Sequence, residues 1–221
     1  MNMLLIVAFL VLLAIVFATR SRSAATVPTN IMDPAGWEIG PIVNGENYSK
    51  GVPLHPRPHK DGWCIDIPHP NAEAGHVHYV TVPTNALAGK TKIALKYRFE
   101  MDEGVRLCPV HSPEAPGLLT LYFQRKNDDF SGQGAGEIFR WYAGFATQPE
   151  LHNGDYVAEA PLDSNWTAVL VSSRASNPDG FAAALADTGR VGFVLGGGDG
   201  LGHGVFATGP ARLVVTSFEV V

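Results

Sequence analysis

Cysteine is scarce in this chain of 221 residues, which contains only Cys64 and Cys108. The two are not spaced as a Cys-x-x-Cys pair, so zinc ribbons and redox sites built on that motif are excluded. In an exported protein the two cysteines can form one disulfide between distant strands. Two buried thiols are the alternative, because free cysteine packs as a small apolar residue.

Basic residues are also few. The chain has 16 Lys and Arg against 21 Asp and Glu, with a formal net charge of −5, and no segment gathers the basic residues into a stripe. Binding to a phosphate backbone depends on clustered Lys and Arg. We therefore expect no nucleic acid among the partners.

Several catalytic signatures are missing. There is no Gly-x-Ser-x-Gly nucleophile elbow and no His-Glu-x-x-His zinc motif. His76 and His78 lie two apart on an expected strand and so share a face, although a lone His-x-His is more typical of hydrogen-bonded or surface structure. We count both as ligand-binding candidates and expect no metal and no cofactor, with a structural calcium left open.

An apolar run, MLLIVAFLVLLAIVFA, occupies residues 3–18, with no Lys or Arg before it. The run is shorter than the roughly 20 residues of a spanning helix and is typical of a signal-peptide core. Residues 23–25, Ser-Ala-Ala, fit a cleavage site. Arg20 and Arg22 fit an uncleaved anchor equally well, and a literal positive-inside interpretation of them places the body in the cytoplasm.

These features predict three parts. We expect a signal peptide or membrane anchor at 1–25, a linker at 26–36 and one β-sandwich domain at 37–221. The protein is then periplasmic, extracellular or held at a membrane by its N-terminal segment.

The body is a series of short segments rich in aromatic and β-branched residues, separated by Gly, Pro, Asn and Asp, which predicts strands. The expected strands are 37–43, 63–67, 76–82, 92–101, 118–125, 137–147, 155–162, 166–171, 190–196, 204–208 and 211–221. One helix is expected where Asn177 can cap, Pro178 opens the first turn and Gly189 ends the segment. This pattern indicates an all-β fold, a two-layer antiparallel jelly-roll sandwich with one short helix.

Alternation along three of these strands assigns side chains to two faces. One row holds large apolar residues and is expected in the core, and the other is polar and aromatic. If the strands are neighbours, the second row forms an exposed platform of Tyr122, Gln124, Arg140, Tyr142 and Arg98. Tyrosine rings can stack on a sugar ring, while Arg and Gln can bind hydroxyls or a uronate carboxylate. An ordinary solvated sheet face is the alternative.

The segment VLGGGDGLGHGVF at residues 194–206 is rich in glycine. It has neither the spacing of a dinucleotide fingerprint nor a Gly-Lys-Ser/Thr, and a single copy does not make a calcium repeat. We interpret it as a wide turn or bulge between two strands. Asp199 and His203 can still line a ligand site at the end of the sheet.

Two sets of residues offer catalytic chemistry. FEMDEG places Glu100 and Asp102 on one strand face, and it superficially resembles the Glu-x-Asp-x-x-Glu strand of sandwich-fold glucanases. Val105 stands where that pattern has its last Glu, so a solvated strand end is the favoured interpretation. A polysaccharide lyase would need His, Tyr and Arg, which His76, Tyr142 and Arg140 can supply.

Residues 165–221 carry a resemblance to a known fold family. DSNWTAVL, the helix NPDGFAAALADTG, RVGFVLGG and the terminal ARLVVTSFEVV together resemble the closing part of galactose-binding-like β-sandwiches. Non-catalytic carbohydrate-binding modules use that fold, so the resemblance implies binding of a polysaccharide or other glycan without catalysis. A lyase or glycoside hydrolase on the same scaffold is the first alternative, and a structural envelope protein without a small ligand is the second.

Overall fold

The computed structural model describes residues 26–144, 150–169, 172–198 and 200–221. The expected signal or anchor at 1–25 lies outside the described residues, as does Asp199. Within the described ranges, no helix has both the length and the apolar character needed to cross a membrane.

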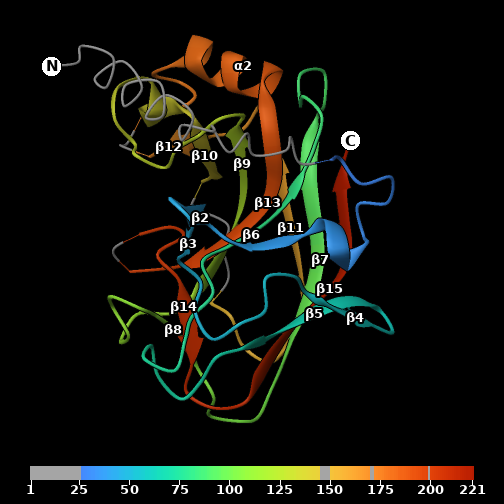
Figure 1. Cartoon of the computed structure of the whole chain (residues 1–221), viewed down its shortest axis with the longest axis vertical. Coiled ribbons are helices and arrows are strands. Elements are labelled where there is room, and N and C mark those ends of the chain that lie inside the picture. The colour runs from blue at the N-terminus through green and yellow to red at the C-terminus, as the bar shows by residue number, and fades with distance from the viewer. Residues whose placement is uncertain (1–25, 145–149, 170–171, 199) are drawn as a thin grey trace, which may run out of the picture.

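The fold is all-β, with two antiparallel sheets that enclose a shared core (Figure 1). The first sheet has six strands in the order β1-β6-β13-β9-β10-β12. Their bounds are β1 Glu38–Gly40, β6 Tyr79–Pro83, β13 Thr188–Gly196, β9 Leu118–Arg125, β10 Arg140–Ala143 and β12 Trp166–Ala168.

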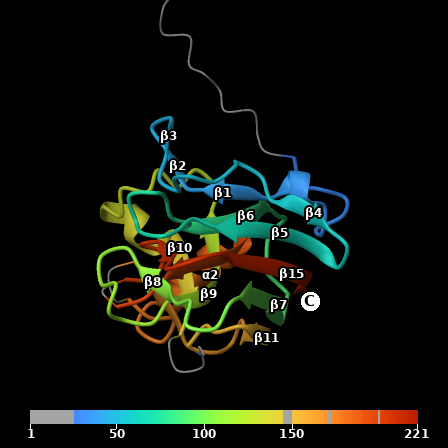
Figure 2. The same cartoon turned by 90° about the horizontal axis from the view of Figure 1, so that it is seen from below.

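The second sheet has five strands in the order β11-β7-β15-β5-β4. Their bounds are β11 Gly154–Pro161, β7 Lys92–Met101, β15 Ala211–Val220, β5 Gly62–Ile67 and β4 Arg57–His59. The C-terminal strand β15 lies in the middle of this sheet, between β7 and β5, as both views show (Figure 1, Figure 2).

Smaller elements complete the described chain. They are the pair β2 Ile42–Val43 and β3 Glu46–Asn47, the pair β8 Leu107–Pro109 and β14 Val205–Ala207, the short 3-10 helices η1 Pro34–Gly36 and η2 Gly134–Ile138, and the helix α2 Pro178–Ala186. The sequence did not indicate β3, β4 and β8, which are only two or three residues long and carry no alternation.

All four tryptophans lie in the core, three of them on strands and Trp37 directly before β1. Trp37, Trp63, Trp141 and Trp166 are fully buried. The rings of Trp37 and Trp63 are centred 4.8 Å apart, and Phe193 and Phe218 pack against Trp37. This aromatic cluster joins strands from both sheets, so it holds the two layers together.

The helix prediction is confirmed. Asn177 caps α2 by accepting a hydrogen bond from the Gly180 N–H at 3.0 Å, and Pro178 is the first helical residue. The helix ends at Ala186, earlier than the sequence indicated, because β13 already begins at Thr188.

The segment expected as a linker contacts the domain. Ile31 and Met32 pack against the core, and the Trp37 indole N–H donates to the Ile31 carbonyl at 2.6 Å. Cys64 and Cys108 are both buried and free. Of the two alternatives, the structure therefore shows two buried thiols and not a disulfide.

Candidate functional site

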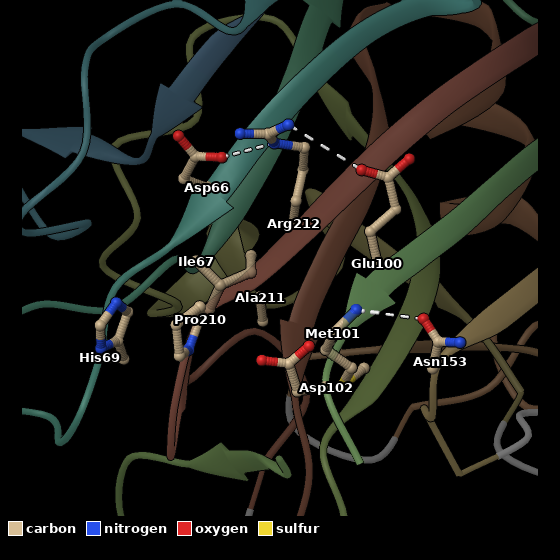
Figure 3. Close-up of a pocket in the computed structure, with 10 residues that line it drawn as sticks. All are labelled: Asp66, Ile67, His69, Glu100, Met101, Asp102, Asn153, Pro210, Ala211 and Arg212. Carbon is tan, nitrogen blue, oxygen red and sulfur yellow. Dashed lines mark hydrogen bonds and ion pairs between the residues drawn. The ribbon is translucent and has the colours of Figure 1, made fainter.

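A cavity of about 520 Å³ opens on the outer face of the five-stranded sheet, where β5 and β7 end and β15 begins (Figure 3). We call it the β5–β7–β15 groove. Its lining residues are Asp66, Ile67, His69, Glu100, Met101, Asp102, Asn153, Pro210, Ala211 and Arg212. This volume falls within the roughly 300–1,000 Å³ typical of small-molecule sites.

Strand register assembles the upper wall of this groove. Arg212 on β15 stands opposite Asp66 on β5 and opposite Glu100 on β7. All three side chains point outward because their strand neighbours, such as Ile67, Phe99 and Leu213, are buried. Residues far apart in the sequence therefore meet at one place on the sheet.

Ion pairs hold this wall in place. Arg212 Nε lies 2.7 Å from Asp66 Oδ1, and its Nη1 lies 3.9 Å from Glu100 Oε2. Arg57 pairs with the other oxygen of Asp66. Arg98 Nη2 bridges Glu100 Oε1 at 2.9 Å and Asp61 Oδ2 at 2.8 Å. We call this alternating set Arg57–Asp66–Arg212–Glu100–Arg98–Asp61 the charge ladder. These pairs are partly exposed, so they orient side chains more than they stabilise the fold.

Hydrogen bonds within the charge ladder shift the pKa values of two of its members. A hydrogen bond from Arg98 lowers the pKa of Asp61. A hydrogen bond to Asp66 raises the pKa of Arg212. Both hydrogen bonds favour the charged forms of Asp61 and Arg212.

The lower part of the groove carries polar groups that are still free. In the part of the chain that the structure describes, no side chain pairs with the Asp102 carboxylate or with the exposed His69 ring. Asn153 Oδ1 accepts from the Met101 N–H at 3.1 Å, which leaves its amide N–H groups for a ligand. Figure 3 places Asp102 between His69 and Asn153, facing the ladder.

The predicted exposed platform is wrong. Tyr122, Gln124, Arg140 and Tyr142 do share the outer face of the six-stranded sheet, and their strands are neighbours, but all four are at most 7% exposed. Phe130, Val169 and Leu201 from three separate loops pack over the tyrosines. Arg98 lies on the other sheet, in the charge ladder.

The covered residues form a buried polar cluster. The hydroxyls of Tyr79 and Tyr142 are 2.8 Å apart, and the Tyr122 hydroxyl donates to Gln124 Oε1 at 2.8 Å. Burial raises the pKa of each of these tyrosines. At neutral pH they are uncharged hydrogen-bonding groups inside the protein, closed to a ligand in this state.

Arg140 and Asp128 form a buried ion pair at the edge of this cluster. Arg140 Nε lies 3.1 Å from Asp128 Oδ2, but the atoms are not aligned for a hydrogen bond. The guanidinium also lies 4.8 Å from the centre of the Phe130 ring. Burial raises the pKa of Asp128, and the charge of Arg140 only partly opposes that effect.

His76 and His78 lie together, with ring centres 4.8 Å apart. His78 Nδ1 is 2.9 Å from the Gly202 carbonyl, which makes Nδ1–H the donor and leaves Nε2 buried without a partner in the described chain. Burial is the main reason that the pKa of His78 falls to about 4. Among the described residues, no group of three or more His, Cys, Asp or Glu side chains can hold a metal ion.

The glycine-rich segment is a turn between β13 and β14, as the sequence predicted. Its glycines allow the backbone to pack on side chains: a Cβ on Gly204 would lie 2.6 Å from His78 Nε2, and one on Gly202 would lie 2.9 Å from the Tyr79 ring. His203 is exposed at this turn, with its ring 5.8 Å from that of His111.

Sequence reasoning found two groove residues, Glu100 and Asp102, and missed the others. Alternation in WCIDI and ARLVV indicates that Asp66 and Arg212 point away from the core, but it does not reveal which strands pair. His69 and Asn153 lie in loops, where no periodic signal exists.

Comparison with known proteins adds no family to this description. No protein-family model matches the chain, and a search of the curated proteins finds no match. The fold and the site therefore define only a class, an all-β, sandwich-like protein with an open, charged groove at one end of a sheet.

Proposed function

We propose that the protein is a non-catalytic carbohydrate-binding protein of the cell envelope or exterior, built on a jelly-roll sandwich, and that the β5–β7–β15 groove is its glycan site. The observation that carries the proposal is the groove's mixture of fixed ion pairs and free polar groups in an open cavity. The resemblance of residues 165–221 to galactose-binding-like sandwiches is consistent with this function.

The chemistry of the lining fits a polyhydroxylated ligand. Carboxylates accept two hydrogen bonds from neighbouring hydroxyls, and a guanidinium or an amide donates in the same planar geometry. Asp102, Asn153 and Arg212 supply these groups from three different segments. The openness of the groove allows a chain of sugars to continue beyond it.

A glycoside hydrolase is the second candidate, because Glu100 and Asp102 both line the groove. A hydrolase needs one protonated carboxylic acid as a proton donor. Glu100 is already engaged in ion pairs with Arg98 and Arg212, so neither of its oxygens is free to serve as that donor. This environment supports binding over catalysis.

The test uses the purified full-length chain on a broad glycan panel, with binding and product release measured in the same wells. We expect binding without product. The double variant Asp102→Ala/His69→Ala should weaken binding about ten-fold while the melting temperature is unchanged, since neither side chain bonds within the described fold. Asp163→Ala is the control, because Asp163 is an exposed acid just beyond the far end of β11.

Other outcomes separate the alternatives. Release of reducing sugar would establish a hydrolase, and a product that absorbs in the near ultraviolet would establish a lyase. If no glycan on the panel binds or is converted to product, and none raises the melting temperature, the alternative of a structural envelope protein is favoured.

A further inference from the structure

The balance of charge in the β5–β7–β15 groove carries an inference about its ligand, which rests on the proposed function. Three carboxylates line the cavity, from Asp66, Glu100 and Asp102, against one guanidinium, from Arg212. The cavity itself, lined also by parts of Ile67, Met101 and Ala211, defines the site. The charges decide what it accepts.

Every guanidinium near the groove is already paired. Arg57 and Arg212 bond Asp66, and Arg98 bonds Glu100 and Asp61. The ladder therefore contains three cations and three carboxylates and is neutral as a whole. Among the described residues that line the groove, Arg212 is the one Lys or Arg side chain, and it is already paired with Asp66 and Glu100.

Asp102 is the carboxylate left over. It follows directly after β7, is exposed to the cavity and has no ion-pair partner in the described chain. The carboxylate that a ligand meets is thus free of an ion pair, and Asn153 and His69 on either side offer further hydrogen-bonding groups (Figure 3).

We infer that the groove prefers saccharides that carry a free, protonated amine. The ammonium group of an amino sugar pairs with Asp102. The ring hydroxyls bond the Asn153 amide and the carboxylate oxygens of Asp66 and Glu100, the two acids of the charge ladder that line the cavity. N-acetylation removes the positive charge and weakens binding. A uronate places a second carboxylate beside Asp102 and binds worst, because no unpaired Lys or Arg side chain lines the described groove to offset the repulsion.

The test compares four oligosaccharides of equal length by calorimetry on the full-length protein: oligomers of glucosamine, N-acetylglucosamine, glucose and galacturonate. Measurements at about pH 6, where an aliphatic amine is protonated, are made at about 20 mM and about 300 mM salt. We expect the glucosamine oligomer to bind about five- to ten-fold more tightly than the neutral ones at low salt, with the preference shrinking at high salt.

The variant Asp102→Asn keeps the shape and hydrogen-bonding capacity of the side chain and removes its charge. It should abolish the preference for glucosamine and leave binding of the neutral oligomers within about two-fold. Asp163→Asn is the matched control and should leave the preference intact, because it lies beyond the opposite end of β11.

Two results would overturn the inference and leave the proposed function standing: equal, salt-insensitive binding of charged and neutral oligomers, or tightest binding of the galacturonate oligomer. Failure of all four oligomers to bind, together with silence on the broad panel, would overturn the proposed function and this inference with it.

Discussion

At the scale of single residues, His78 is a largely buried titratable side chain whose surroundings change its pKa. Its Nδ1–H bonds the Gly202 carbonyl, and its Nε2 has no partner in the described chain. The neighbouring rings of His76, His203 and His111 add like charge if they protonate. Burial is the main reason that the folded protein favours the neutral form of His78, and the bond to the Gly202 carbonyl opposes it only in part.

This preference predicts acid sensitivity. The pKa of His78 is about 4 in the folded protein, against an ordinary value of 6.5 for histidine in the unfolded chain. As pH falls, the unfolded chain therefore protonates at His78 before the folded protein does. Its stabilising contribution is complete above about pH 6.5 and is lost between there and about pH 4, for a total of about 3 kcal/mol.

Urea titrations at several pH values measure the free energy of unfolding. His78→Gln should flatten this part of the profile, whereas His152→Gln, at an exposed position, should not. Identical profiles for wild type and His78→Gln would contradict the assignment.

Two glycines allow the cost of backbone strain to be measured separately from the cost of a steric clash. Gly204 has φ of 91° and no room for a Cβ beside His78, whereas Gly45 has φ of 84° and nothing within 4 Å. Gly45→Ala should cost only the left-handed backbone strain, about 1–2 kcal/mol. Gly204→Ala should cost about 1–3 kcal/mol more, because His78 must move. Denaturant midpoints compare the two, and equal losses would mean that the turn relaxes freely around the new methyl group.

At the scale of elements, β9 and β10 have two buried faces instead of one. Their inner rows pack into the sandwich core, and their outer rows lie under loops that carry Phe130, Val169 and Leu201. The outer rows remain polar because the cluster satisfies most of its own hydrogen bonds. A polar outer row is thus no proof of exposure.

The Arg140–Asp128 pair should stabilise the covering loop strongly. Arg140→Met leaves the Asp128 carboxylate buried alone and should cost about 3–5 kcal/mol. Adding Asp128→Asn should recover part of this loss, because the amide still accepts the Phe130 N–H and carries no charge. A double-mutant cycle by urea denaturation measures the coupling. The exposed pair Lys92–Glu159 is the control, with expected coupling of about 0–1 kcal/mol. Equal coupling at the two pairs would show that Arg140 and Asp128 are solvated.

At the scale of the whole molecule, aromatic packing joins the sheets without a covalent link. Trp37, Trp63, Phe193 and Phe218 bridge the layers, and neither cysteine takes part in a disulfide. The buried core is large enough that a chain of this length is stable without a disulfide.

Thiol labelling tests this arrangement. Cys64 and Cys108 are at most 4% exposed, and burial raises the pKa of Cys64, so both should react slowly with a thiol reagent in the native protein. Denaturation without a reductant should release both thiols to the reagent. Recovery of no reactive thiol after denaturation would show a disulfide instead.

The sequence by itself determined the local features of this protein. Alternation and strand-forming composition located all seven described strands of five or more residues, and alternation located the core row of β7. Asn177 with Pro178 located the start of α2. These signals depend on residues close in the chain. The expected strand at 137–147 was less successful, since η2 occupies its beginning and β10 starts at Arg140.

Only the tertiary structure decided which polar rows are open to solvent. The row of Tyr122 and Arg140 is closed by loops from elsewhere in the chain, and the row of Glu100 and Arg212 stays open beside a cavity. Alternation assigns a side chain to a face, but covering that face depends on segments distant in sequence. The groove likewise exists because register sets Asp66, Arg212 and Glu100 side by side on three strands, a pairing that no local pattern encodes.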